Sequence, residues 1–173
     1  MGKLYSLWII PTSSLKKSLD EIILKLAKKY KSPKFEAHMT LLGDIDSDEK
    51  TIIQKTKKLA SETKPFPLQL GEISFSTTYF QSVFVRVKAT AKLMEVNLKA
   101  KEIFKVDNDV FMPHMSLLYG NHQMKLREKI TPEIELPKYK YFKAEKIIVV
   151  PDAQNPSEWR HLAEIPLCLR SSI

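Results

Sequence analysis

Cysteine is almost absent from this chain of 173 residues, which contains Cys168 and no other. One thiol cannot form a disulfide within the chain, and no cysteines and histidines follow the spacing of a zinc site. We therefore expect no metal, no cofactor and an inert thiol near the C-terminus. The low cysteine content fits a reducing compartment, and we expect a cytoplasmic protein.

Long apolar runs and glycine-rich segments are missing too. The apolar run at residues 4–10 is too short to span a bilayer, and the chain has only four glycines. With 43% apolar and 28% charged residues, the composition is typical of a globular protein. The length indicates one domain over residues 1–173, and we expect a monomer that does not bind membranes.

Acidic residues are fewer than basic ones, which leaves a net charge of +8. This excess favours an anionic small molecule or a nucleic acid as partner. Much of it lies in residues 25–34 and 54–60, where the pattern is helical and the lysines would coat solvated faces. Charge alone therefore does not identify a partner.

Apolar periodicity and turn residues predict a mixed order of strands and helices. Helices are predicted at residues 15–30, after the capping residues 46–48, at 89–104 and at 125–130. Strands are predicted at residues 5–10, 35–42, 68–75, 80–87, 110–119, 140–150 and 159–167.

Two short segments of the sequence are almost identical. HMTLLG begins at residue 38 and HMSLLYG begins at residue 114. Each lies on the last strand of a strand, helix, strand unit, and Trp8 precedes His38 by 30 residues as Val85 precedes His114 by 29. This repetition indicates two related half-domains whose motif strands face a shared cleft, rather than a solenoid of many copies.

Each motif combines one imidazole with one hydroxyl. Residues i and i+2 of a strand point to the same face, so His38 lies beside Thr40 and His114 beside Ser116, with the intervening residues in the core. One neutral histidine can take a proton from water while the other, protonated, gives a proton to a departing oxygen. The hydroxyls can donate to phosphoryl oxygens. The pattern predicts cleavage of a phosphodiester without a metal.

Other interpretations of the motifs fit less well. A single histidine two residues before a hydroxyl is common and usually structural, but two copies at equivalent places in a repeated unit are not expected by chance. A zinc site lacks carboxylate or cysteine ligands at suitable spacing. A serine hydrolase lacks the G-x-S-x-G setting.

These motifs resemble those of the 2H phosphoesterase superfamily, and in particular the plant and yeast cyclic nucleotide phosphodiesterases. The resemblance extends in order through LYSLWIIP (4–11), SPKFEAHMTLLG (32–43), TTYFQSVFVRVKAT (77–90), FMPHMSLLYG (111–120) and EWRHLAEIPL (158–167). It implies an α+β, bilobal fold with two β-sheets related by a pseudo-twofold axis around a central cleft and helices on the outer faces.

The resemblance also implies an activity. The expected substrates are ADP-ribose 1″,2″-cyclic phosphate and nucleoside 2′,3′-cyclic phosphates, which would give ADP-ribose 1″-phosphate and nucleoside 2′-phosphates. His38, Thr40, His114 and Ser116 would be catalytic, with His114 as base and His38 as acid, although the near-symmetry of the motifs leaves these two roles interchangeable.

Several aromatic and basic residues are secondary candidates. Tyr119 and Trp8 resemble substrate-contacting residues of that family, and core packing is an equal alternative for Trp8. Phe80 and Phe84 share a strand face and are expected in the core, with the cleft wall as the alternative, and Trp159 is expected in the core. Arg86 would meet a phosphate or form a surface ion pair.

The two remaining histidines, His122 and His161, lack a hydroxyl residue two positions later and are expected to be structural.

Two further functions remain open on the sequence alone. One is a 2′-5′ RNA ligase-like enzyme that acts on RNA ends with a 2′,3′-cyclic phosphate, which the basic charge favours. The other is a non-catalytic RNA-binding module, which would bind RNA in a salt-dependent way without turnover.

Overall fold

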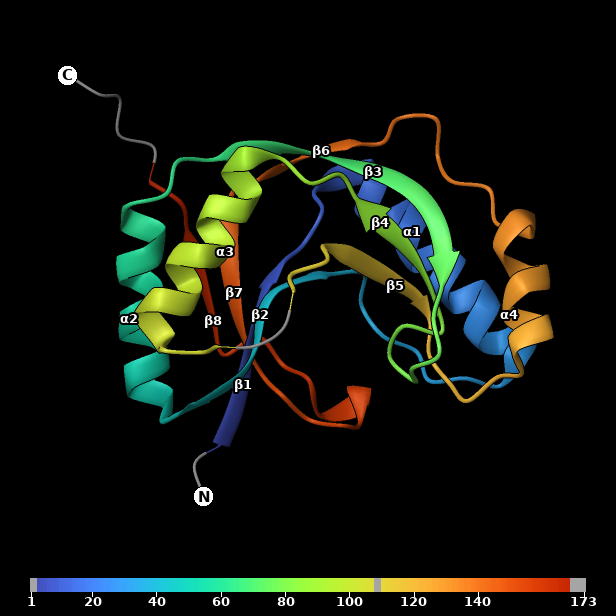
Figure 1. Ribbon diagram of the computed structural model, residues 1–173, viewed down its shortest axis with the longest axis horizontal. Helices are drawn as coiled ribbons and strands as arrows, with labels where there is room; N and C mark the ends of the chain where they lie inside the picture. The colour runs from blue at the N-terminus through green and yellow to red at the C-terminus, as the bar shows by residue number, and fades with distance from the viewer. Residues whose placement is uncertain (1–2, 108–109, 169–173) are drawn as a thin grey trace.

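The computed structural model describes residues 3–107 and 110–168. Within these ranges the chain forms an α+β fold (Figure 1). The strands are β1 (Lys3–Ile9), β2 (Met39–Ser47), β3 (Phe66–Phe75), β4 (Val83–Val87), β5 (His114–Leu118), β6 (Tyr141–Ala144), β7 (Lys146–Pro151) and β8 (Ala163–Pro166). The helices are α1 (Ser13–Tyr30), α2 (Glu49–Ser61), α3 (Ala91–Phe104) and α4 (Met124–Ile130), with 3-10 turns at Thr131–Glu133 and Pro156–Glu158.

The strands lie in the order β6-β3-β4-β5-β2-β1-β7-β8, and neighbours run antiparallel. Each motif strand is the inner strand of a four-stranded half, and the unit β1-α1-β2 corresponds to β4-α3-β5. The bilobal α+β architecture expected from the sequence is confirmed. The two expected sheets are joined edge to edge, so that they form the halves of one eight-stranded sheet.

Among the described residues, β2 and β5 join the two halves through one ladder pair, Met39 and Met115. Both methionines are fully buried, as the alternation of each motif predicts. In an antiparallel pair with this register, His38 lies across from Ser116 and Thr40 lies across from His114. The join therefore brings the two motifs together around a pseudo-twofold axis.

Helices cover each half of the sheet. Helix α1 packs against β5, whereas α3 packs against β2 and α2 against β7 and β8. Figure 1 shows α2 and α3 together at one side of the molecule and α1 and α4 at the other. Each helix of the repeated unit thus covers the motif strand of the other unit. Leucines and isoleucines at helical spacing on α1, such as Leu19 and Ile23, are buried in the shared core.

The bounds of several strands differ from the predicted ones. Strand β2 begins at Met39, so that His38 directly precedes it, and β5 begins at His114. Alternation predicts extended backbone, but only residues with a partner strand join the ladder. The predicted strand 140–150 is two strands: β6 pairs with β3 at one edge of the sheet, and β7 pairs with β1 in the other half. The strand-like pattern of residues 140–150 carries no sign of such a change of partner.

Asp48 caps α2 as predicted, because its side chain accepts a hydrogen bond from the backbone N–H of Thr51 at 2.9 Å. None of the helices in the part of the chain that the structure describes has the length and apolarity to cross a bilayer.

Candidate active site

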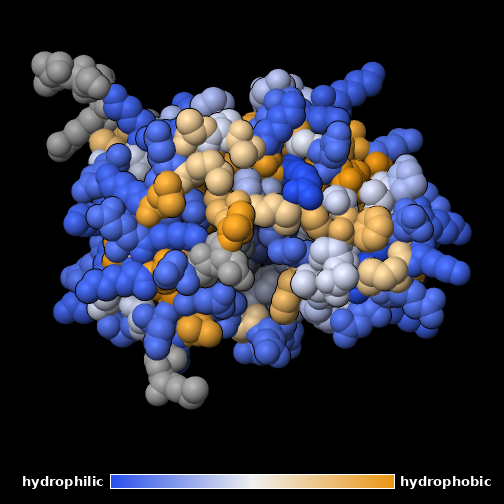
Figure 2. All heavy atoms as spheres, in the orientation of Figure 1, coloured by the Kyte–Doolittle hydropathy of each residue, from blue (hydrophilic) through white to orange (hydrophobic). Residues whose placement is uncertain are grey.

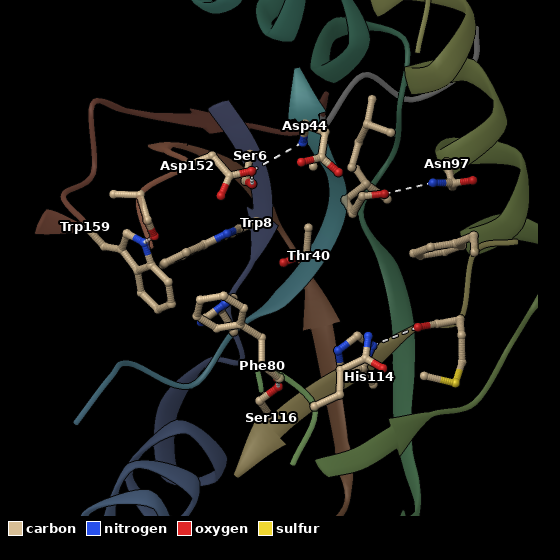
Figure 3. A pocket seen from close by; sticks show the side chains of 18 of the residues that line it. Ser6, Trp8, Thr40, Asp44, Phe80, Asn97, His114, Ser116, Asp152 and Trp159 are labelled. Atoms are coloured by element: carbon tan, nitrogen blue, oxygen red, sulfur yellow. Dashed lines mark hydrogen bonds between the residues drawn. The ribbon is translucent and has the colours of Figure 1, made fainter. Parts of the chain in front are cut away.

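A pocket opens where the two motif strands meet, and it has a volume of about 450 Å³. All four motif residues, His38, Thr40, His114 and Ser116, line it. In the space-filling view the corresponding face is hollowed near its centre (Figure 2), and Figure 3 shows side chains from both halves of the sheet pointing into the space between them. The two motifs therefore converge on one pocket, as the sequence predicts.

The two histidines are oriented by the same contact. Nδ1 of His38 lies 2.7 Å from the carbonyl oxygen of Glu36, and Nδ1 of His114 lies 2.8 Å from that of Met112. A carbonyl oxygen can only accept, so Nδ1 carries the hydrogen in both rings. In the neutral tautomer this leaves the lone pair on Nε2, which can accept a proton, and in the imidazolium Nε2 can donate one.

His38 lies in an aromatic enclosure. The Trp8 ring stacks on it at a centroid distance of 3.6 Å, and Trp159 meets it edge-on at 5.5 Å. Phe35 approaches from a third direction at 6.4 Å. Burial lowers the pKa of His38 to about 4, although the carbonyl and the negative charge of Glu36 act in the opposite direction.

His114 has fewer aromatic neighbours. Phe84 meets its ring at 5.3 Å, and Arg86 is its partner across the β4–β5 ladder. Burial lowers the pKa of His114 from its usual range, and the positive charge of Arg86 lowers it further. Burial thus favours the neutral form of both rings, and the negative charge of Glu36 opposes it at His38, whereas the positive charge of Arg86 adds to it at His114.

The two hydroxyls differ in their contacts. The Ser116 hydroxyl donates to the carbonyl oxygen of Phe80 at 2.6 Å. Thr40 lines the pocket from β2, across from His114 (Figure 3). A hydroxyl has a single hydrogen, so Ser116 must rotate away from Phe80 before it can donate to a ligand.

The structure places both secondary candidates in the pocket wall. Trp8 is 4% exposed and covers His38, so its ring serves the histidine as much as a ligand. Tyr119 is buried and stacks on Phe35 at 3.8 Å, and burial raises the pKa of its phenol, with Ser116 as a hydrogen-bond partner.

Two residues expected in the core line the pocket instead, which for Phe80 is the alternative that the sequence left open, while Trp159 also packs against a buried cluster that includes Trp8. Trp159 precedes β8 in the loop after β7 and lines the pocket, with its indole N–H donating to the carbonyl oxygen of Ala153 at 2.7 Å. Phe80 precedes β4, is 39% exposed and also lines the pocket. Apolar alternation cannot separate a pocket wall from a core, because both require apolar side chains. Phe84, in contrast, is buried as expected.

One end of the pocket contains two carboxylates that no sequence motif singles out. Asp152 accepts a hydrogen bond from the Ser6 hydroxyl at 3.0 Å and another from the backbone N–H of Asp44 at 3.3 Å. Both aspartates line the pocket, one directly after β7 and the other within β2 (Figure 3). They lie 108 residues apart in the chain, and only the β2-β1-β7 order of the sheet brings them together.

The other histidines make structural contacts, as expected. His122 Nε2 lies 2.9 Å from the Ser32 hydroxyl, and His161 lies between the carboxylates of Glu36 and Glu164. Over residues 3–107 and 110–168, the structure contains no group of three histidine, cysteine or acidic side chains able to hold a metal ion.

Comparison with solved structures defines the class of this fold. The chain superposes on TT0787 of Thermus thermophilus with a TM-score of 0.64 and 16% identity, covering 95% of this chain and 97% of that one. It superposes on E. coli LigT complexed with phosphate with a TM-score of 0.63 and 13% identity, covering 96% and 98%. LigT has also been crystallised with 3′-AMP, ATP and NADP+. This is the fold of the 2H phosphoesterases.

Sequence comparison gives the family. Residues 1–167 match the family model CPDase, described as cyclic phosphodiesterase-like protein, and the chain therefore belongs to this family. A relative in Arabidopsis thaliana, named cyclic phosphodiesterase, is 24% identical over 117 residues, which span 67% of this chain and 65% of the relative, slightly less than two thirds of its length.

Proposed function

We propose that this protein hydrolyses cyclic phosphate diesters of nucleotide size without a metal, with His38 and His114 as the acid and base pair. One observation carries the proposal: both imidazoles line one pocket, and each is oriented by its Nδ1–H so that Nε2 remains for proton transfer. Family membership supports the same activity.

In the proposed reaction, Nε2 of His114 takes a proton from a water molecule whose oxygen attacks phosphorus. The bond from phosphorus to one ring oxygen breaks, and Nε2–H of His38 gives its proton to that oxygen. One proton is taken and one is given, so the pair ends with its protonation exchanged. The hydroxyls of Thr40 and Ser116 donate to the nonbridging oxygens, where charge builds up.

The different surroundings of the two histidines support these roles. Arg86 favours the neutral ring of His114, which a base needs, and Glu36 favours the imidazolium of His38, which an acid needs. The stacked face of Trp8 also stabilises a cationic ring. Burial keeps His38 neutral in the free protein, so we expect its proton to be taken up together with the anionic substrate.

The substrate proposal is a nucleoside 2′,3′-cyclic phosphate or ADP-ribose 1″,2″-cyclic phosphate, with a nucleoside 2′-phosphate or ADP-ribose 1″-phosphate as product. A pocket of about 450 Å³ suits a ligand of this size. Asp44 and Asp152 would repel a further phosphate at their end of the pocket, which favours a nucleoside 2′,3′-cyclic phosphate over an RNA end and requires the diphosphate of an ADP-ribose substrate to lie away from that end. The structures of LigT with phosphate and 3′-AMP support nucleotide binding by this fold.

A product assay tests the proposal. The protein is incubated with 2′,3′-cyclic AMP and excess chelator, and the products are separated to distinguish 2′-AMP from 3′-AMP. We expect 2′-AMP at an undiminished rate in chelator. Parallel assays with ADP-ribose 1″,2″-cyclic phosphate and an oligonucleotide with a 2′,3′-cyclic end compare the substrate classes. Absence of hydrolysis on all three, or activity that chelator abolishes, contradicts the proposal.

A further inference from the structure

Glu36 contacts the surroundings of His38 through two different groups. Its backbone carbonyl accepts the Nδ1–H of His38 at 2.7 Å and so fixes the tautomer of that ring. Its carboxylate contacts Lys16 of α1 at 3.0 Å and His161 at 2.7 Å. Glu36 therefore links the histidine to a charged cluster outside the pocket.

His161 connects this cluster to a distant segment. Its Nε2 meets Glu36 and its Nδ1 meets Glu164 of β8 at 2.8 Å, and Glu164 is paired with Lys146 of β7. Both carboxylates can only accept, so both ring nitrogens donate when both bonds are made. The Glu36–His161 contact spans 125 residues of sequence.

The segment that His161 anchors also carries a wall of the pocket. Trp159, two residues earlier, meets the His38 ring at 5.5 Å and the Trp8 ring at 5.2 Å, both edge-on. Glu36 thus fixes the direction of the His38 ring, and the segment that contains His161 carries the Trp159 indole that shields this ring.

We infer that the Glu36–His161 contact is a positioning device, which holds the segment carrying Trp159 against His38 and thereby keeps that imidazole oriented and shielded from solvent. Any effect of this contact on turnover rests on the function proposed above. Its effect on the orientation and burial of the His38 ring does not.

Two features separate this contact from an ordinary surface ion pair, whose contribution is small. The side chains of His161 and Glu36 are only 29% and 33% exposed. The pair also belongs to a chain of contacts from Lys16 on α1 to Lys146 on β7, which crosses both halves of the molecule. Loss of its central member therefore frees the Trp159 segment from the segment before β2.

The test is an NMR titration of His38 in the wild-type protein and in His161→Ala. The low pKa of His38 comes mainly from burial and in smaller part from the charge of His161, so exposure of the ring together with loss of that charge should raise it by about one unit or more in the variant. Acrylamide quenching of tryptophan fluorescence should increase at the same time, because Trp159 becomes accessible. If the protein hydrolyses 2′,3′-cyclic AMP, the limb of the pH–kcat profile assigned to His38 should move by the same amount.

Two variants serve as controls. Glu62→Gln removes a surface ion pair with Lys99 on α3, away from the pocket, and should leave the titration unchanged. Glu164→Gln removes the other partner of His161 but keeps the Glu36 contact, and should move the pKa of His38 less than His161→Ala does. Unchanged acrylamide quenching in folded His161→Ala overturns the inference even if the pKa of His38 rises, because loss of the His161 charge alone raises that pKa, and an unchanged His38 titration overturns it as well. A raised His38 pKa with increased quenching in a protein without hydrolase activity would contradict only the proposed function.

Discussion

His38 and His114 make the same hydrogen bond from equivalent positions, since each ring donates to the carbonyl two residues earlier. Their neighbours differ. His38 is enclosed by Trp8 and Trp159 with the Glu36 carboxylate nearby, and His114 lies beside Arg86 and meets the ring of Phe84. The duplicated backbone sets the direction of both rings, and residues outside the duplicated motifs set their protonation.

Under the proposed mechanism, this comparison bears on how a nearly symmetric site would perform an asymmetric reaction. An acid and a base need opposite charge states at the same pH. Two identical environments would give both histidines the same charge preference. Burial lowers the pKa of both rings, but a nearby charge differs, since Glu36 raises the pKa of His38 and Arg86 lowers that of His114, and this difference assigns the roles in our proposal.

The largest expected effect comes from removing either imidazole. His38→Ala and His114→Ala should each lower kcat on 2′,3′-cyclic AMP by about 10²–10⁴-fold, because general acid–base catalysis contributes this much. Steady-state kinetics measure the loss, and circular dichroism checks that the variants fold. His122→Ala, which alters a histidine outside the pocket lining, is the matched control and should keep most of the activity. A near-normal rate in His38→Ala or His114→Ala would contradict the proposal that these two histidines act as acid and base.

Stability should show the difference in burial between the two rings. His38 has a pKa of about 4 in the folded protein against about 6.5 when unfolded, so the unfolded chain binds more protons between these values. Stability is then full above about pH 6.5 and falls as the pH is lowered to about 4, by about 3 kcal/mol for this residue.

Urea unfolding of His38→Gln and His114→Gln across this pH range tests that expectation. In the wild-type protein the free energy of unfolding should rise with pH over this range. His38→Gln should reduce this slope more than His114→Gln does, since burial moves the pKa of His38 to about 4, whereas the pKa of His114 shows a smaller downward shift. If the free energy of unfolding depends equally on pH in the two variants, the aromatic enclosure of His38 does not lower its pKa below that of His114.

The hydroxyl pair offers a third comparison. Thr40→Val should lower kcat by about 10²-fold, as the loss of one donor to a developing oxyanion typically does. Ser116→Ala should cost less, because the Ser116 hydroxyl must first give up its 2.6 Å bond to Phe80 before it can donate to a substrate. The decrease in kcat of each variant is measured at saturating substrate. A larger decrease for Thr40→Val supports the expected difference, and equal decreases would mean that the two hydroxyls contribute equally.

The sequence predicts the repeated part of this molecule well and the rest poorly, for a physical reason. The motif residues and their buried neighbours Met39 and Met115 follow from strand alternation, which is local. Trp159 and Asp152 reach the pocket through the loop after β7, and the position of β7 next to β1 depends on pairing between distant segments. Local patterns contain no information on such pairing, so sequence reasoning places Trp159 in the core and does not select Asp152.

Arg86 gives the smallest expected effect and the sharpest test of the assigned roles. It is exposed, so its field at His114 is weakened by solvent, and Arg86→Gln should raise the pKa of His114 by about half a unit. A base must be neutral to act, so a higher pKa moves the acidic limb of the pH–kcat/KM profile upward. If His114 is instead the acid, the alkaline limb moves upward and activity extends to higher pH. Lys88→Gln, which alters another exposed cation two residues further along the chain, is the control for a general change of surface charge and should move neither limb as far.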